Sequence, residues 1–106
     1  MGIQIVVTSN LFEPIPAGAN QFGLRDATAR SLSRQPEAAL SHAIAPWSDT
    51  VFNGEQVPRL LQEFRFLAKD SDDVIRGDLE EAASFIEGEI DRVGHGRHCY
   101  IVFLGD

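Results

Sequence analysis

The chain has a single cysteine, Cys99, among its 106 residues, so no disulfide can form within it. The residues around it, HCYIVFL, predict a buried strand in which the thiol behaves as a small hydrophobic group. A chain without internal disulfides is typical of a reducing compartment. The opening MGIQIVVTSN lacks the basic residues and the apolar length of a signal peptide, and no stretch reaches the ~20 apolar residues that cross a membrane. We therefore expect a cytoplasmic protein with no membrane partner.

Positive charge is also scarce, and this bears on the class of partner. Nine lysine and arginine residues stand against 16 aspartate and glutamate residues, and the formal net charge is −7. Phosphate contacts need clustered lysine and arginine, whereas here these residues are scattered, so nucleic acid is an unfavourable partner. An acidic surface instead favours solubility or docking onto a basic protein.

Motifs for metal, cofactor or catalysis are lacking. His95 and His98 lie three residues apart, but the sequence has no second histidine or cysteine pair to complete a zinc site. The carboxylates of the 73–93 region do not follow the spacing of a calcium-binding loop. Gly94 and Gly96 precede an expected strand rather than open a helix, so they do not form a phosphate site. We therefore predict no metal and no cofactor, and we regard catalysis as less favoured than binding.

The sequence does contain the apolar patterns of one α+β domain spanning residues 1–106. In Ile3 to Thr8 and in residues 98–104, apolar residues occupy both odd and even positions, so both faces of each strand would be apolar. This predicts two interior strands, most simply side by side. Two amphipathic helices are predicted at about 55–69 and 73–93, packed on a small sheet that includes these terminal strands. Two strands alone are marginally stable, so a third is expected within 9–23 or 47–53, or from a second subunit.

The helical patterns carry further expectations. The 55–69 helix should bury an apolar stripe made of Val57, Leu60, Leu61, Phe64, Leu67 and Ala68. Phe66 projects from the opposite, polar side; it either contacts another part of the chain or marks a self-association interface. A shorter helix is expected between Pro36 and Pro46, burying Ala39, Leu40, Ala43 and Ile44. The acidic residues of the 73–93 helix are expected mostly on a solvated face.

A group of polar residues forms the candidate site, and it surrounds the start of the first long helix. Its members are Trp47, Asp49, Thr50, Asn53, His98 and Asp106. In the functional interpretation they form a small pocket where the turn before the helix meets the C-terminal strand. In the structural interpretation Asp49 and Asn53 bond to backbone N–H groups of consecutive turns. Asn53 and Gln56 could form a capping box, but Pro58 favours a tight turn over residues 53–57, with the helix beginning after it. We favour the structural interpretation.

The segment W-S-D-T-V-F-N, the helix pair that follows and the closing H-C-Y-I-V-F-L-G-D resemble a group of small uncharacterised bacterial proteins. Members share a D-T-V-F-N turn and a C-terminal strand that ends in Gly-Asp. The resemblance covers residues 40–106 and implies only that the turn and the terminus lie together in the fold. It implies no activity, cofactor or catalytic residue.

Three hypotheses for function follow. The first is a non-catalytic protein-binding or regulatory domain that neutralises a basic partner, as immunity proteins do. The second is a small ligand-binding or hydrolase-like domain that uses Asp49, Asn53, His98 and Asp106. The third is a homodimer that depends on a shared sheet or on the Phe66 surface.

Overall fold

The computed structural model describes residues 2–12, 14–15, 18–35, 37–45, 47–93 and 98–105. They form an α+β arrangement, which confirms the predicted fold class. In the described ranges no helix has both the length and the apolar content that a membrane span requires. In chain order the elements are β1 (Ile3–Thr8), β2 (Phe22–Leu24), α1 (Asp26–Ser33), η1 (Ser41–Ala43), β3 (Thr50–Asn53), α2 (Val57–Lys69), α3 (Asp73–Val93) and β4 (Tyr100–Leu104).

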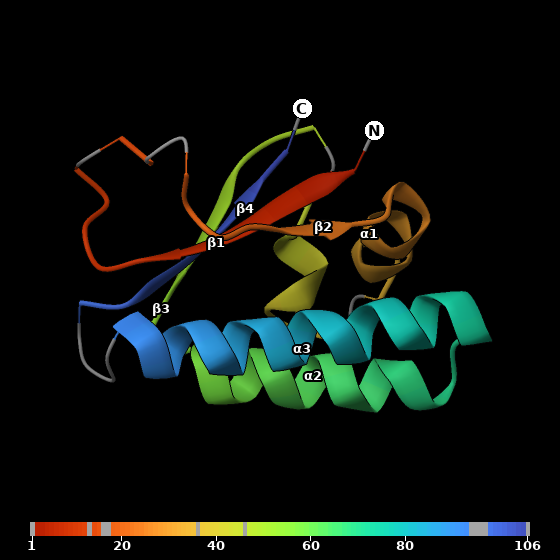
Figure 1. Cartoon of the computed structure of the whole chain (residues 1–106). Coiled ribbons are helices and arrows are strands. Elements are labelled where there is room, and N and C mark those ends of the chain that lie inside the picture. Colours follow the sequence, from red (N-terminus) through yellow and green to blue (C-terminus); the bar gives the residue numbers. More distant parts are fainter. Residues whose placement is uncertain are drawn as a thin grey trace.

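The sheet has the strand order β2-β1-β4-β3, and each neighbouring pair is antiparallel. The N- and C-terminal strands therefore lie side by side at its centre, as predicted (Figure 1). Both regions proposed for a third strand supply one, because β2 begins within 9–23 and β3 lies within 47–53. These two short strands form the edges of the sheet.

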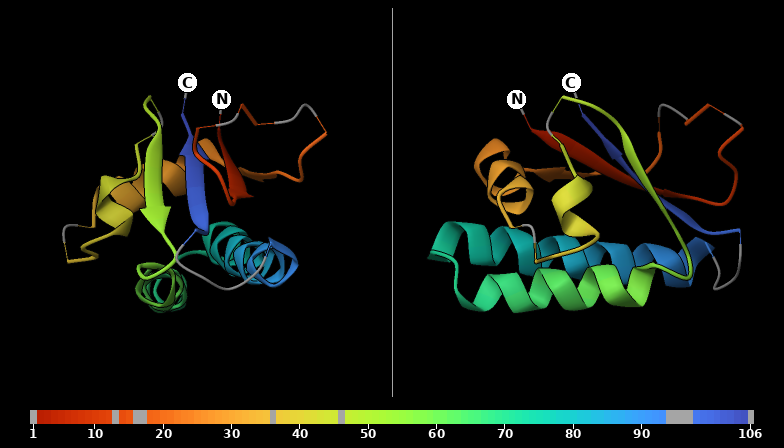
Figure 2. Two further views of the ribbon diagram at one scale, coloured as in Figure 1. Left: turned by 90° about the vertical axis from the view of Figure 1, so that its left-hand side faces the viewer. Right: turned by 180° about the vertical axis from the view of Figure 1, so that it is seen from behind.

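The two long helices run antiparallel to one another and pack together beneath the sheet (Figure 1). The end-on view in Figure 2 shows α2 and α3 side by side, with the strands above them. Alternate residues of β1 and β4 point to this side and join the core with the helices. Phe103 lies at its centre, with its ring 5.7 Å from that of Phe52 and 6.2 Å from that of Phe64, both edge-on.

The other face of the sheet carries a second, smaller apolar row. Val6 pairs with Val102, which in turn pairs with Val51. Val6 and Val102 are buried, although they are not part of the main core cluster, whereas Val51 on the edge strand is 46% exposed. Apolar residues on both faces are typical of interior strands, and this explains the unbroken apolar runs in β1 and β4.

The prediction of a helix between Pro36 and Pro46 is wrong. Within the described residues 37–45 the only regular element is the three-residue 3₁₀ turn η1, and Ala39 and Ala43, which should have faced the core, are exposed. The backbone N–H groups of Leu40 and Ser41 bond to the carboxylate of Glu63 on α2 rather than to carbonyl groups of a helix. A long-range hydrogen bond has therefore overridden the local helical pattern.

The expectation of a solvated acidic face on α3 is wrong for two residues. Asp78 and Glu89 are buried, and each binds a segment near β2. Asp78 accepts the backbone N–H of Arg25 at 2.9 Å, just before α1, and Glu89 accepts the amide of Asn20 at 3.2 Å. The hydrogen bond from Arg92 lowers the pKa of Glu89, against the opposing effect of burial. The other acidic residues of the predicted face, Glu80, Glu81, Glu87 and Asp91, are exposed.

Candidate binding sites

The residues of the candidate site divide between the two ends of β3. Asp49 precedes the strand, and its Oδ1 accepts the backbone N–H of Gly105 at 3.1 Å. Asn53 closes the strand and pairs with Tyr100, two residues after His98. Four residues of extended chain separate Asp49 from Asn53, which is about 13 Å. One small pocket around both side chains is therefore not formed.

The polar side chains of this group are engaged with the backbone. Asn53 Oδ1 accepts the N–H of Gln56 at 3.1 Å, and Gln56 Oε1 accepts the N–H of Asn53 at 3.0 Å. This reciprocal pair closes the turn before α2, whose N-cap is Gln56. The hydroxyl of Thr50 donates to the carbonyl of Ala43 at 3.3 Å. Trp47 is 70% exposed, and His98 is exposed as well.

Asp106 and His95 lie outside the described residues, so the structure does not place them. Among the residues that are placed, no three histidine, cysteine, aspartate or glutamate side chains gather closely enough to hold a metal ion. Asp49 and Asn53 thus act on the backbone as Asx residues do in turns.

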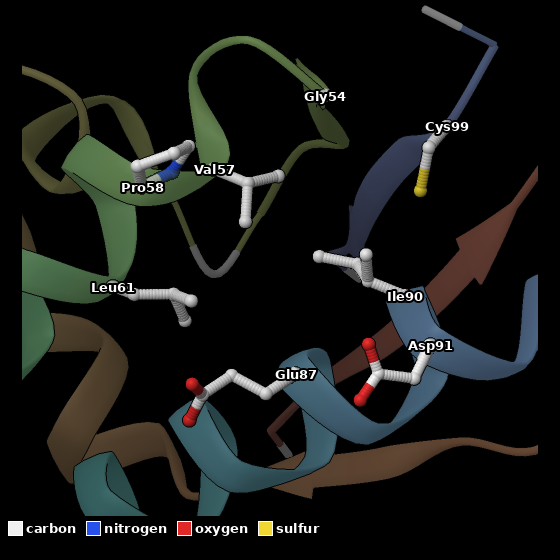
Figure 3. Close-up of a pocket in the computed structure, with 8 residues that line it drawn as sticks. All are labelled: Gly54, Val57, Pro58, Leu61, Glu87, Ile90, Asp91 and Cys99. Atoms are coloured by element: carbon white, nitrogen blue, oxygen red, sulfur yellow. The ribbon is translucent and has the colours of Figure 1, made fainter. Parts of the chain in front are cut away.

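A cavity of about 300 Å³ opens where the start of α2, the last turns of α3 and the residue before β4 meet (Figure 3). Its walls are mostly apolar. The lining residues are Gly54, Val57, Pro58, Leu61, Glu87, Ile90, Asp91 and Cys99. The volume lies at the lower end of the range of small-ligand pockets.

The carboxylates of Glu87 and Asp91 lie on one wall of this cavity, which we name the Cys99 cavity (Figure 3). They are four residues apart on α3 and therefore share one side of the helix. Glu87 is 49% exposed and pairs with the guanidinium of Arg65 on α2. The cavity thus joins an apolar interior to a wall that carries two carboxylates, one of them in an ion pair.

Cys99 is 2% exposed, and its sulfur points toward the cavity and Ile90 (Figure 3). Burial raises the pKa of its thiol above the ordinary value. Because the thiolate is the reactive form, this environment does not activate Cys99 as a nucleophile. Its predicted burial in apolar surroundings is confirmed.

Phe66 forms a second distinct surface feature. Its side chain is 60% exposed, so most of it remains in solvent. It borders a hollow of about 320 Å³, which is also lined by Glu37, Ala38, Arg59, Gln62, Glu63 and Leu67. We call this region the Phe66 surface.

The sequence did not single out the Cys99 cavity, because its residues come from three separate segments, each with an ordinary role. The i, i+4 spacing of Glu87 and Asp91 was a detectable signal, but it is also what a solvated helix face shows. Comparisons with protein-family models, with curated proteins and with solved structures find no match to this chain.

Proposed function

We propose that this protein is a non-catalytic binding domain whose partner is a basic protein. The observation that carries the proposal is its uncompensated surface charge. Of the eight lysine and arginine residues in the described part of the chain, six lie in ion pairs with carboxylates. Exposed carboxylates outside these pairs include Glu37, Asp49, Glu55, Asp70, Asp72, Glu80 and Glu81.

Among the described residues, only two basic side chains lie outside ion pairs, Arg34 and Lys69, so the acidic side chains outnumber them. The surface potential is therefore negative, which attracts a cationic protein and raises its association rate at low ionic strength. We place this interaction in the cytoplasm. Its proposed outcome is neutralisation or regulation of the partner, as in immunity proteins.

The Phe66 surface is the proposed point of close contact. Exposed aromatic side chains dominate the binding energy of many interfaces, particularly beside a hollow that a partner can fill and within a polar rim. Phe66 is 60% exposed beside such a hollow, whose lining carries charge of both signs through Glu37, Glu63 and Arg59. Steering by charge and anchoring by one aromatic residue are compatible in a single interface.

The test begins with a photoreactive benzoylphenylalanine at position 66, produced in the native host. A crosslinked protein is then identified, purified and titrated against the unmodified chain by calorimetry. We expect a partner with a basic isoelectric point, and a Kd that rises steeply with added salt. We also expect Phe66→Ala to weaken binding by about tenfold or more.

Val74→Ala is the matched control, because Val74 is a similarly exposed apolar residue, 58% exposed, on α3 rather than α2. It should leave the Kd unchanged. A partner that binds equally well after Phe66→Ala and at high salt would refute the proposal, and so would the absence of any protein crosslinked from position 66.

Self-association is the second candidate, and the exposed edge strand β3 together with Phe66 favours it. A second copy could extend the sheet along β3 or cover the Phe66 surface. Light scattering at micromolar concentration would then give twice the mass of the chain, and Phe66→Ala or a proline at Val51 would restore the monomer. A monomeric mass in the unmodified protein excludes this candidate.

A further inference from the structure

Phe12 is the most exposed large apolar side chain in the part of the chain that the structure describes, at 99%. Hydrogen bonds close the turn that carries it, because its backbone N–H donates to Asn10 Oδ1 at 2.9 Å and the N–H of Asn10 donates to Thr8 Oγ1 at 3.2 Å. Leu11 beside it is 44% exposed, and neither side chain joins the core. The turn therefore presents an aromatic ring to solvent, where it adds nothing to the packing of the described core.

The Cys99 cavity lies at the same end of the molecule as this turn. Thr8, the last residue of β1, pairs with Tyr100, and Cys99 comes immediately before Tyr100. Both figures accordingly place the start of the segment after β1 at the end of the molecule where β4 begins and α3 ends (Figures 1 and 2). The left panel of Figure 2 faces this end. A projecting ring and a cavity thus occupy one end of a single chain.

The surface that the cavity offers to a guest is aliphatic. Val57, Leu61 and Ile90 supply most of it (Figure 3). The carboxylate of Glu87 is held in an ion pair and Asp91 is engaged as well, so neither calls for a charged guest. An apolar cavity of about 150 Å³ can take up a benzene ring, so a volume of about 300 Å³ admits the side chain of a phenylalanine.

We propose that two copies of this chain form a dimer in which the Phe12 ring of each copy occupies the Cys99 cavity of the other. Because the ring and the cavity lie at one end of the chain, a twofold axis satisfies both contacts at once, and the assembly closes at two copies. Each phenylalanine buries about 150–250 Å² and covers a comparable area of cavity, so the total is about 600–1,000 Å², whereas a stable interface needs about 1,200–2,000 Å². The dimer is therefore weak, with a Kd above about 10 μM.

This interface is separate from the Phe66 surface. Phe66 lies in the second half of α2, whereas the cavity is lined by the first turns of that helix, so one chain can hold a basic partner and a second copy together. Salt distinguishes the two contacts. Two chains of net charge −7 repel each other, so added salt should tighten the dimer, whereas it should weaken a complex with a basic protein.

The first experiment follows the methyl groups of Val57, Leu61 and Ile90 by NMR while the protein is concentrated from micromolar to millimolar. An aromatic ring seated in the cavity shifts these resonances upfield through its ring current. We expect upfield shifts that grow with concentration, and a mass by sedimentation that rises toward twice that of the chain and no further. Phe12→Leu keeps an apolar side chain without a ring, so it should abolish the upfield shifts.

Trp47→Ala is the matched control, because Trp47 is a 70% exposed aromatic residue before β3, whereas the cavity borders Gly54 after it. It should leave the dimer unchanged, as should Phe66→Ala. A monomeric mass at millimolar concentration, or upfield shifts that persist in Phe12→Leu, would overturn the proposal. So would indole that binds in the cavity of a chain that stays monomeric, since the cavity would then take a small apolar ligand instead.

A photoreactive benzoylphenylalanine at position 12 locates the contact directly. In a mixture of isotopically light and heavy protein, irradiation should join position 12 of one copy to a peptide of the other copy that contains Val57, Leu61 or Ile90. The same probe at position 47 should give no such product. Crosslinks within a single copy, or to another surface of the second copy, would show that Phe12 does not enter the partner's cavity.

Discussion

Glu63 is the residue whose replacement best tests the physical account of this fold. It is 7% exposed on α2, and its carboxylate accepts the backbone N–H groups of Ser41 at 2.8 Å and Leu40 at 3.1 Å. The Arg59 side chain donates to it at 3.0 Å. We predict that Glu63→Ala will destabilise the protein strongly, because it removes the acceptor that holds η1 against α2.

The magnitude follows from the groups left behind. Ser41 is fully buried, so its N–H would lose its partner without gaining water, at a cost of about 1–3 kcal/mol. The bonds to Leu40 and Arg59 are lost as well, and the total should reach about 3–5 kcal/mol, as when other buried charged partners are removed. Glu63→Gln keeps one acceptor oxygen and should cost less.

Urea denaturation at pH 7, followed by circular dichroism, measures this loss. A destabilisation of 3 kcal/mol corresponds to a fall in the midpoint of about 2 M for a slope near 1.5 kcal/mol/M. Arg59→Ala should cost only about 1 kcal/mol or less, because Arg59 is 58% exposed. Glu80→Ala, an exposed acidic residue on α3, should change stability by less than about 0.5 kcal/mol. If Glu63→Ala is as mild as Glu80→Ala, the stated role of Glu63 is wrong.

The pH dependence of stability gives a second measurement on the same residue. Burial alone would raise the pKa of Glu63, but hydrogen bonds from Ser41, from the backbone of Leu40 and from Arg59 lower it below its ordinary value of 4.5. A carboxyl that is harder to protonate in the folded state stabilises the fold above pH 4.5. That stabilisation is lost as the pH falls through the lowered pKa. Glu63→Gln should flatten the acid limb of the stability profile, and an unchanged limb would refute this reasoning.

Three other predictions concern local structure. Gly77→Ala and Gly88→Ala should each raise the free energy of unfolding by about 0.5–1 kcal/mol, because a Cβ at either position meets no atom within 4 Å. Gly105→Ala should instead lower the thermal midpoint, since its Cβ would lie 2.6 Å from the backbone nitrogen of Ser48. Asn53→Ala should cost about 1 kcal/mol through loss of the hydrogen bond from the Gln56 N–H to Asn53 Oδ1, and a cost near zero by urea denaturation would contradict that role.

The elements with strong periodicity could be predicted from the sequence. The 73–93 helix matches α3 at both ends, and the 55–69 helix differs from α2 only in its first turn. Five residues of the predicted stripe on α2 are buried and Leu67 is half-buried, so the apolar pattern identified the side facing the core. The pairing of the terminal strands followed from their apolar residues at both odd and even positions, which make both faces of each strand apolar.

The region before β3 could not be predicted, because a distant side chain decides its structure. Its apolar spacing favoured a helix, yet Glu63 lies more than 20 residues away and binds the N–H groups of Leu40 and Ser41. The residue types of 37–45 give no sign of this bond. The same holds for Asp78 and Glu89, whose burial depends on where β2 and α1 meet α3.

The candidate site shows the same division between local and distant effects. The tight turn before α2 could be predicted from spacing, since Asn53 and Gln56, which exchange hydrogen bonds in it, lie on one short segment. The separation of Asp49 from His98 depends on the register of β3 against β4, which a sequence of four strand residues does not specify. The Cys99 cavity is assembled from three segments and is visible only after they pack.

Three carboxylates are buried in the part of the chain that the structure describes, and they bear on the acidic composition. Glu63, Asp78 and Glu89 each form an ion pair with an arginine and bind a nitrogen donor of another segment. They therefore contribute to folding while adding no uncompensated charge. The net charge of −7 must then reside on the remaining, largely exposed side chains. Self-repulsion there opposes compactness, so a basic partner that neutralises it would stabilise the domain as well as bind it.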